Sequence, residues 1–171
     1  MGGRAAKQKG SRAERVVRDL LKRIYPPEKR SRIQRVPMSG ASWMKGDVID
    51  MNDTEMSYEV KNQETLALPD WWRQTKVQAS SWQIPVLVFT SNHRPFYWVM
   101  KAEDWESYLG QTGYQKVSEP IRDSTRNIFK KLSALDPWDY LLIDLDGDQV
   151  AVIQTEDYIT VKKEIYKDGH S

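Results

Sequence analysis

The order of short apolar segments between residues 11 and 100 is the feature that most constrains how this chain can fold. Apolar residues recur at helical spacing from Ser11 to Ile24, and Pro26-Pro27 ends that helix. Strand-length segments and one further helical segment follow, separated by turn residues. We expect helices over 11–24 and 70–82, and strands over 32–36, 47–51, 56–62, 85–90 and 96–100. This order predicts an α/β fold, a mixed β-sheet flanked by helices.

The last third of the chain is polar and less regular. Its pattern predicts helices over 103–109 and 125–132. It also predicts strands over 140–145, 150–154 and 159–165, with Asp146-Gly147 as a hairpin turn. We therefore divide the chain into a flexible basic arm (1–10), a core (11–110) and a β-containing extension packed on the core (111–171). The sequence assigns no role to the extension.

Positive charge is concentrated at the N-terminal end. Residues 1–35 contain twelve Lys and Arg residues and three acidic ones, a net charge of +9, whereas the rest of the chain carries −7. Such a segment attracts polyanions, of which duplex DNA is the commonest, although a solvated helix face with a frayed basic tail would look the same. The residues expected to contact phosphates are Arg4, Lys7, Lys9, Arg12, Arg30, Arg32 and Arg35.

Composition narrows the choice of metal and compartment. The chain has no Cys, and its two His residues, His93 and His170, lie far apart, so thiolate and His-rich zinc sites are excluded. Carboxylates would have to hold any metal, which indicates Mg²⁺ with Mn²⁺ as a substitute. We see no signal peptide and no apolar run near the roughly 20 residues that span a membrane. We expect a soluble, cytoplasmic protein with no membrane partner and no small-molecule cofactor.

Asp47, Glu59 and Lys61 form the pattern that carries chemistry. Side chains alternate along a strand, so Glu59 and Lys61 point to one side of 56–62, and a hairpin with 47–51 would bring Asp47 close to them. Two carboxylates can hold a divalent cation for phosphodiester hydrolysis, with the backbone carbonyl of Val60 as an extra ligand. A lysine beside the attacking water can orient it and offset charge in the transition state.

Asp47, Glu59 and Lys61 resemble the spaced pattern of the PD-(D/E)xK nuclease superfamily, with Gly46 where that pattern often has proline. Lys9–Arg15 (KGSRAER) and the loop Ser39-Gly40-Ala41-Ser42 are similar to the archaeal-type Holliday junction resolvases of that superfamily, and the resemblance covers roughly residues 7–100. It implies a restriction-endonuclease-like core and a homodimer that nicks opposite strands of a four-way junction symmetrically. It also implies Glu14, Asp47 and Glu59 as metal ligands, Lys61 as the catalytic lysine, and Ser39 as an assisting serine.

Glu14 and the serines of the 39–42 loop each allow a second interpretation. Glu14 could instead close a capping box with Ser11, and Ser42 competes with Ser39 as the loop serine. Lys45, in the Trp43-Met44-Lys45 loop, is placed to touch DNA. Asp50 falls on the opposite face from Asp47, which indicates a structural role. We expect five tryptophans to be core or interface rather than base-stacking residues, namely Trp71, Trp72, Trp82, Trp98 and Trp105.

The function predicted from these patterns is metal-dependent resolution of branched DNA. The alternatives are another PD-(D/E)xK DNA endonuclease of repair or restriction type, a DNA-binding protein that has kept the fold without turnover, and a nuclease that acts on RNA.

Overall fold

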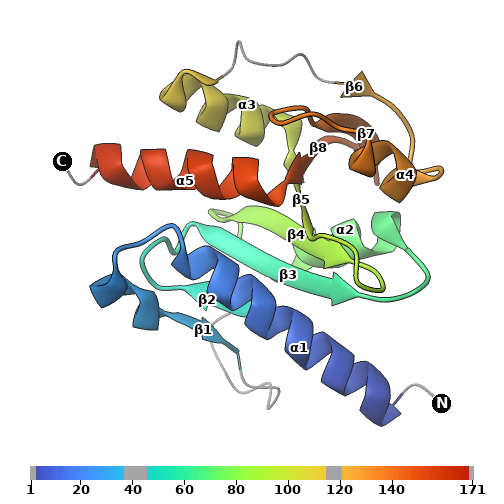
Figure 1. Cartoon of the computed structure of the whole chain (residues 1–171), viewed down its shortest axis with the longest axis horizontal. Coiled ribbons are helices and arrows are strands. Elements are labelled where there is room, and N and C mark those ends of the chain that lie inside the picture. The colour runs from blue at the N-terminus through green and yellow to red at the C-terminus, as the bar shows by residue number, and fades with distance from the viewer. Residues whose placement is uncertain (1–2, 37–45, 115–120, 170–171) are drawn as a thin grey trace.

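The computed structural model describes residues 3–36, 46–114 and 121–169, and its strands form one mixed sheet (Figure 1). None of the helices in these ranges is both long and apolar enough to span a bilayer. The sheet order is β1-β2-β3-β4-β5-β8-β7-β6. Pairs β3–β4 and β6–β7 are parallel and the other neighbours are antiparallel. The strands are β1 (Ile33–Arg35), β2 (Val48–Asp50), β3 (Met56–Asn62), β4 (Ile84–Thr90), β5 (Tyr97–Lys101), β6 (Ile121–Arg122), β7 (Leu141–Leu145) and β8 (Asp148–Gln154).

Helix α1 (Gly3–Lys22) begins eight residues before the expected start at Ser11. Residues 3–10, which we expected to form a basic arm ahead of the helix, are part of the helix. Alanine, lysine and glutamine in this stretch are strong helix formers; Gly3 is the first residue of the helix, and Gly10 in its interior costs only about 1 kcal/mol. A short 3-10 helix, η1 (Pro27–Arg32), then leads into β1.

Both faces of the sheet are covered by helices. Helices α1, α3 (Ala102–Thr112) and α5 (Thr155–Gly169) pack on one face, whereas α2 (Leu68–Gln78) and α4 (Ile128–Ser133) pack on the other (Figure 1). In β4, Val86 and Val88 belong to the first core and Leu87 and Phe89 to the second. This double burial explains why β4 is an uninterrupted apolar run.

The C-terminal segment continues the same sheet. Strand β8 pairs with β5 in antiparallel register from Tyr97↔Gln154 to Lys101↔Val150. The predicted hairpin turn is confirmed, since Asp146 and Gly147 both have positive φ (48° and 82°) between β7 and β8. The extension therefore widens the sheet that carries the core strands.

The expected strand over 159–165 is wrong, because these residues form part of α5. Tyr158, Ile159, Val161 and Lys162 are buried, and Ile165 packs against the same core. Their spacing follows one helix face, and the β-branched residues that suggested a strand are accommodated there by packing. Here tertiary contacts override local propensity.

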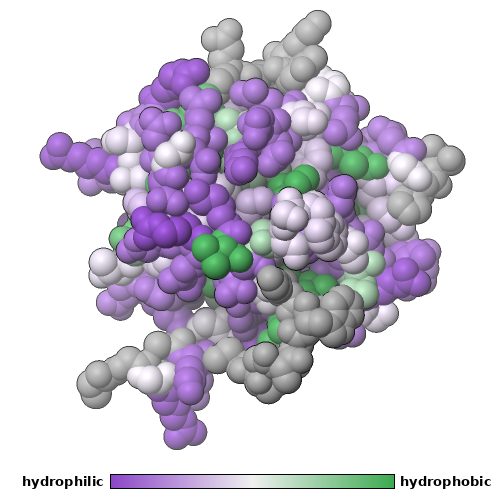
Figure 2. Space-filling view, turned by 180° about the vertical axis from the view of Figure 1, so that it is seen from behind, coloured by the Kyte–Doolittle hydropathy of each residue, from purple (hydrophilic) through white to green (hydrophobic). Residues whose placement is uncertain are grey.

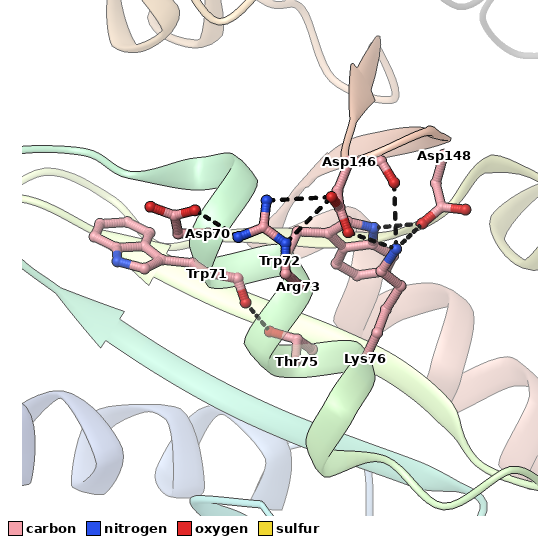
Figure 3. Close-up of polar contacts among 8 residues, drawn as sticks. All are labelled: Asp70, Trp71, Trp72, Arg73, Thr75, Lys76, Asp146 and Asp148. Carbon is pink, nitrogen blue, oxygen red and sulfur yellow. Dashed lines mark hydrogen bonds and ion pairs between the residues drawn. The ribbon is translucent and has the colours of Figure 1, made fainter.

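A polar cluster fixes α2 to the β7–β8 hairpin (Figure 3). Arg73 and Lys76 on α2 form ion pairs with Asp146, at N–O distances of 3.2 and 3.1 Å, and Lys76 also pairs with Asp148 at 2.6 Å. The indole Nε1 of Trp72 donates to Asp148 Oδ2 at 2.9 Å. These contacts connect the helix that follows β3 to the C-terminal part of the chain.

The opposite side of the molecule from Figure 1 is mainly hydrophilic, with apolar side chains in small separate patches (Figure 2). Val77, in the last turn of α2, is 73% exposed, and Trp82, which follows that helix, is 62% exposed. Trp71, Trp72, Trp98 and Trp105 are buried, as expected for core residues. Trp82 differs because it lies in the turn between α2 and β4.

Candidate active site

Asp47 lies at the entrance to β2 with its backbone held between two strands. Its N–H donates to the carbonyl of Tyr58 at 2.8 Å, and its own carbonyl accepts from the N–H of Val36 at 3.0 Å. The Asp47 carboxylate accepts the backbone N–H of Val60 at 2.8 Å. The predicted hairpin of β2 and β3 is confirmed by this antiparallel pairing, and it brings Asp47 against the middle of β3.

The backbone of Gly46 makes this approach possible. Its φ is +102°, and a Cβ atom at this position would lie 2.9 Å from the carbonyl oxygen of Tyr58. Proline, which the superfamily pattern often has here, is fixed near φ −65° and could not adopt this conformation. Glycine therefore allows the chain to enter β2 close to β3.

Glu59 and Lys61 point to the same face of β3, as the alternation predicts. They are in register with Leu87 and Phe89 of β4, which belong to the core under α2, whereas Tyr58 and Val60 belong to the core under α1. Glu59 is only 7% exposed, and Lys61 is half-buried. An acid and a lysine thus lie side by side on a strand that is otherwise buried.

Asp47 and Glu59 are electrostatically coupled. Burial raises the pKa of Glu59, and repulsion by the Asp47 carboxylate and a hydrogen bond to it raise the pKa further, to about 8, while the Lys61 ammonium opposes the shift. Two acids held this closely favour sharing a proton when no cation separates them. The arrangement therefore stores repulsion that a bound cation would relieve.

Glu14 approaches the same site from α1 but is held by Arg35. The Arg35 Nη2–Glu14 Oε2 distance is 3.0 Å, and the Glu14 side chain is 13% exposed. Burial raises the Glu14 pKa and Asp47 adds to the rise, while Arg35 opposes it. The capping-box alternative is wrong, because Ser11 lies inside α1 rather than at its start.

A hard divalent cation needs several oxygen ligands, and the site supplies them from side chains and backbone. Within the described ranges, no three Asp, Glu, His or Cys side chains are grouped closely enough to hold a metal ion. Asp47 and Glu59 still supply two carboxylates. The N–H and C=O groups of one strand residue point toward the same neighbouring strand. Because the Val60 N–H faces the Asp47 carboxylate, the Val60 carbonyl oxygen also lies on the side of Asp47. Mg²⁺ in phosphoryl chemistry typically takes one or two carboxylates, so the residues fit it.

The predicted phosphate-binding residues fall into two groups. Arg4, Lys7, Arg12 and Arg32 are exposed, and the first three lie on the outer side of α1 with Arg15. Lys9, Arg30 and Arg35 have partners within the chain: Lys9 Nζ donates to Asn92 Oδ1 at 2.9 Å, the exposed Arg30 donates from Nε to the carbonyls of Lys22 and Tyr25, both at 3.1 Å, and Arg35 binds Glu14. The pairs Arg35–Glu14 and Lys9–Asn92 join residues 21 and 83 positions apart, so they have no local sequence signal.

Three of the predicted residues lie outside the described ranges, namely Ser39, its competitor Ser42, and Lys45. Asp50 is buried and accepts a hydrogen bond from the hydroxyl of Tyr25 as well as from the N–H of Asn52 at 2.9 Å. It anchors the β2–β3 turn to the end of α1, consistent with the structural role expected for it.

Comparison with known proteins connects this geometry to a family. Residues 5–141 match the model of a family described as "Phage putative PDDEXK endonuclease". No curated protein and no solved structure matches the chain. The matched range contains all but the first two residues of α1, the β2–β3 hairpin and the acid-lysine pair of β3.

Proposed function

The chain belongs to the family of phage putative PDDEXK endonucleases, and from that premise we propose that it is a metal-dependent DNA endonuclease that resolves four-way (Holliday) junctions. The observation that carries the proposal is the coupled pair Asp47 and Glu59 beside Lys61 on one face of β3. The family match extends over most of the chain and supports a nuclease of the PD-(D/E)xK superfamily. It does not distinguish a junction from other DNA substrates.

In this proposal Asp47, Glu59 and the Val60 carbonyl hold Mg²⁺, for which Mn²⁺ can substitute. The ion supplies charge neutralisation at the scissile phosphate and makes a nearby water a stronger acid. Lys61 orients that water and stabilises the negative charge that develops on the phosphate oxygens. Glu59 must give up its proton when the cation binds, so occupancy should rise with pH toward 8.

Preference for a junction is supported by the resemblance of the Lys9–Arg15 segment and by the basic surface of α1. Contacts from Arg4, Lys7 and Arg12 to phosphates position DNA arms without reading bases, which suits recognition of shape. We propose that Glu14 joins the ligand set once Arg35 turns to a phosphate. Two copies of the chain would place two such sites on one junction and give paired symmetric nicks.

The test compares a labelled four-way junction with a linear duplex of the same sequence, in the presence of Mg²⁺ or EDTA. We expect Mg²⁺-dependent cutting of the junction in two strands, with much slower cutting of the duplex. Equal rates on both substrates would favour a repair-type or restriction-type nuclease. A substrate with ribose in place of deoxyribose around the cut separates an RNA-directed enzyme.

Lys61→Ala separates an enzyme from a binding protein. We expect cleavage to fall by at least a hundredfold while junction affinity stays within a fewfold of the native value, because the lysine acts on the transition state. Lys130→Ala, at an exposed position on α4, is the matched control and should cut normally. Native cleavage rates in Lys61→Ala would refute the assignment.

A further inference from the structure

A groove lies between the N-terminal half of α1 and the β4–β5 turn, next to the site but on the other face of β3. Its volume is about 440 Å³, and its polar lining comes from Lys9, Arg12, Asn62, Thr90, Asn92, His93 and Arg94. Figure 1 shows α1 passing the end of the β3 arrow. We propose that this groove binds the sugar-phosphate backbone of the cut DNA strand beside the scissile phosphate. The inference rests on the proposed nuclease function and adds the path of the substrate.

The charge of the groove suits a phosphate backbone. Lys9 and Arg12 enter it from α1 and Arg94 from the β4–β5 turn. None of the described residues that line it is acidic, although the chain as a whole has nearly as many acidic as basic residues. A concave surface lined only by positive charges focuses the electrostatic potential and attracts a polyanion.

The turn that forms one wall is firmly held. Lys9 Nζ donates to Asn92 Oδ1 at 2.9 Å, which connects α1 to the turn. Thr90 Oγ1 donates to the carbonyl of Arg94 at 2.7 Å, and the Arg94 guanidinium lies 4.8 Å from the ring centre of Phe129. Asn92 and His93 both have positive φ (36° and 63°), a conformation that costs energy and places the exposed His93 at the tip. The wall is therefore preorganised.

Asn62 connects the groove to the catalytic strand. It follows Lys61 in β3, so its side chain points to the opposite face and into the groove. Its Oδ1 atom is buried and has no hydrogen-bond partner among the described residues. A buried acceptor of this kind calls for a donor, and because a DNA backbone carries only acceptors, a water that bridges Asn62 Oδ1 and a phosphate oxygen would supply it. The groove thus begins one residue from the lysine at the proposed cut.

The groove also continues into a larger basic surface. Arg12 lines both the groove and the outer side of α1, where Arg4, Lys7 and Arg15 follow. A single phosphate ion would use only part of this surface. A strand that leaves the active site past Asn62 can contact the groove and then the outer side of α1 in sequence, which favours a nucleic-acid backbone over a small anion.

The test measures binding separately from cutting. Affinity for a fluorescent four-way junction is measured by anisotropy in EDTA at several salt concentrations, for the native chain, the double variant Arg12→Ala/Arg94→Ala, and Arg122→Ala at the far edge of the sheet as the control. Each lost phosphate contact should reduce the slope of log K against log salt by about 0.9. We expect the double variant to lose about 1.8 from the slope and at least tenfold in affinity, with Arg122→Ala unchanged.

A second readout places the strand. The chain has no Cys, so His93→Cys offers a unique site for a thiol-directed photocrosslinker, with Arg122→Cys as its control. We expect crosslinks from position 93 to nucleotides that flank the cut, and none there from position 122. An unchanged salt slope in a folded double variant, or crosslinks only to distant arms, would overturn the inference while leaving the nuclease assignment in place. A slope that depends on the groove in a protein that cuts no DNA would overturn the nuclease function and leave the groove as a DNA-binding site.

Discussion

Replacement of Glu59 by Gln should stabilise the protein when no cation is present. The folded chain holds the Glu59 carboxyl at 7% exposure beside Asp47, which raises its pKa from the ordinary 4.5 to about 8. Because the folded-state pKa is raised, the folded state loses stability as pH rises from 4.5 to about 8 and is constant above that. Glutamine has nearly the same shape, can donate a hydrogen bond to Asp47, and cannot ionise.

The size of the effect follows from the pKa. A tenfold difference in proton affinity corresponds to about 1.4 kcal/mol, so ionisation of Glu59 in the unfolded chain at pH 7 favours unfolding by about 3 kcal/mol at most. Relaxation of the structure around the buried Glu59 carboxylate reduces this cost, so we expect about 1–3 kcal/mol. For a chain of this size that is a rise in Tm of roughly 3–10 °C.

The assay is thermal unfolding in EDTA from pH 4 to pH 9, with Glu64→Gln at an exposed position as the control. The difference between Glu59→Gln and the native chain should be near zero at pH 4 and should grow up to pH 8. Millimolar Mg²⁺ should raise the Tm of the native chain and leave Glu59→Gln almost unchanged, since a ligand is lost. A Glu59→Gln variant that is less stable than the native chain at pH 8 in EDTA would refute the reasoning.

Two further predictions concern the backbone and the buried charge. Gly46→Ala should destabilise the fold by about 2 kcal/mol and reduce cleavage, because the added Cβ clashes with the Tyr58 carbonyl in addition to the cost of positive φ. The control is Gly113→Ala, also at positive φ (81°) but with no atom within 4 Å of the added Cβ, which should destabilise less and leave cleavage normal. Equal losses of stability in urea denaturation would contradict the role of the clash. Lys162→Met should lower the free energy of unfolding in urea by about 3 kcal/mol, because the Lys162 side chain, 4% exposed, lies 2.6 Å from Asp53 and its loss leaves that carboxylate unpaired. Lys163→Met, at an exposed position, should cost almost nothing. Equal stabilities of the two variants would show that the ion pair contributes nothing.

The strand-turn-strand unit of the site could be predicted from sequence because its signals are local. Alternation along 56–62 placed Glu59 and Lys61 together, and the turn before Met56 placed Asp47 beside them. The pairing of Glu14 with Arg35 is different, since it depends on how α1 crosses β1, and no local pattern encodes that crossing. The groove was missed for the same reason, because Asn62 and Arg94 meet Arg12 only after three segments have packed.

Errors in the secondary structure have similar causes. Residues 159–165 contain β-branched residues, whose pattern over a short segment is typical of a strand. The apolar residues from Tyr158 to Ile165 instead form one face of α5, and packing of that face against the core favours the helix. The start of α1 was misplaced because Ser11 looks like a cap, while the residues before it are good helix formers with no apolar stripe to reveal them.

The pairing of β5 with β8 also affects how the chain can be made. More than forty residues separate Lys101, at the end of β5, from Asp148, at the start of β8. A growing polypeptide that has already assembled β3, β4 and β5 must wait for the ribosome to deliver this distant partner, and meanwhile β5 presents open hydrogen-bonding groups. Premature termination between these two strands would yield a fragment prone to self-association, even though it contains every residue of the acid-lysine site.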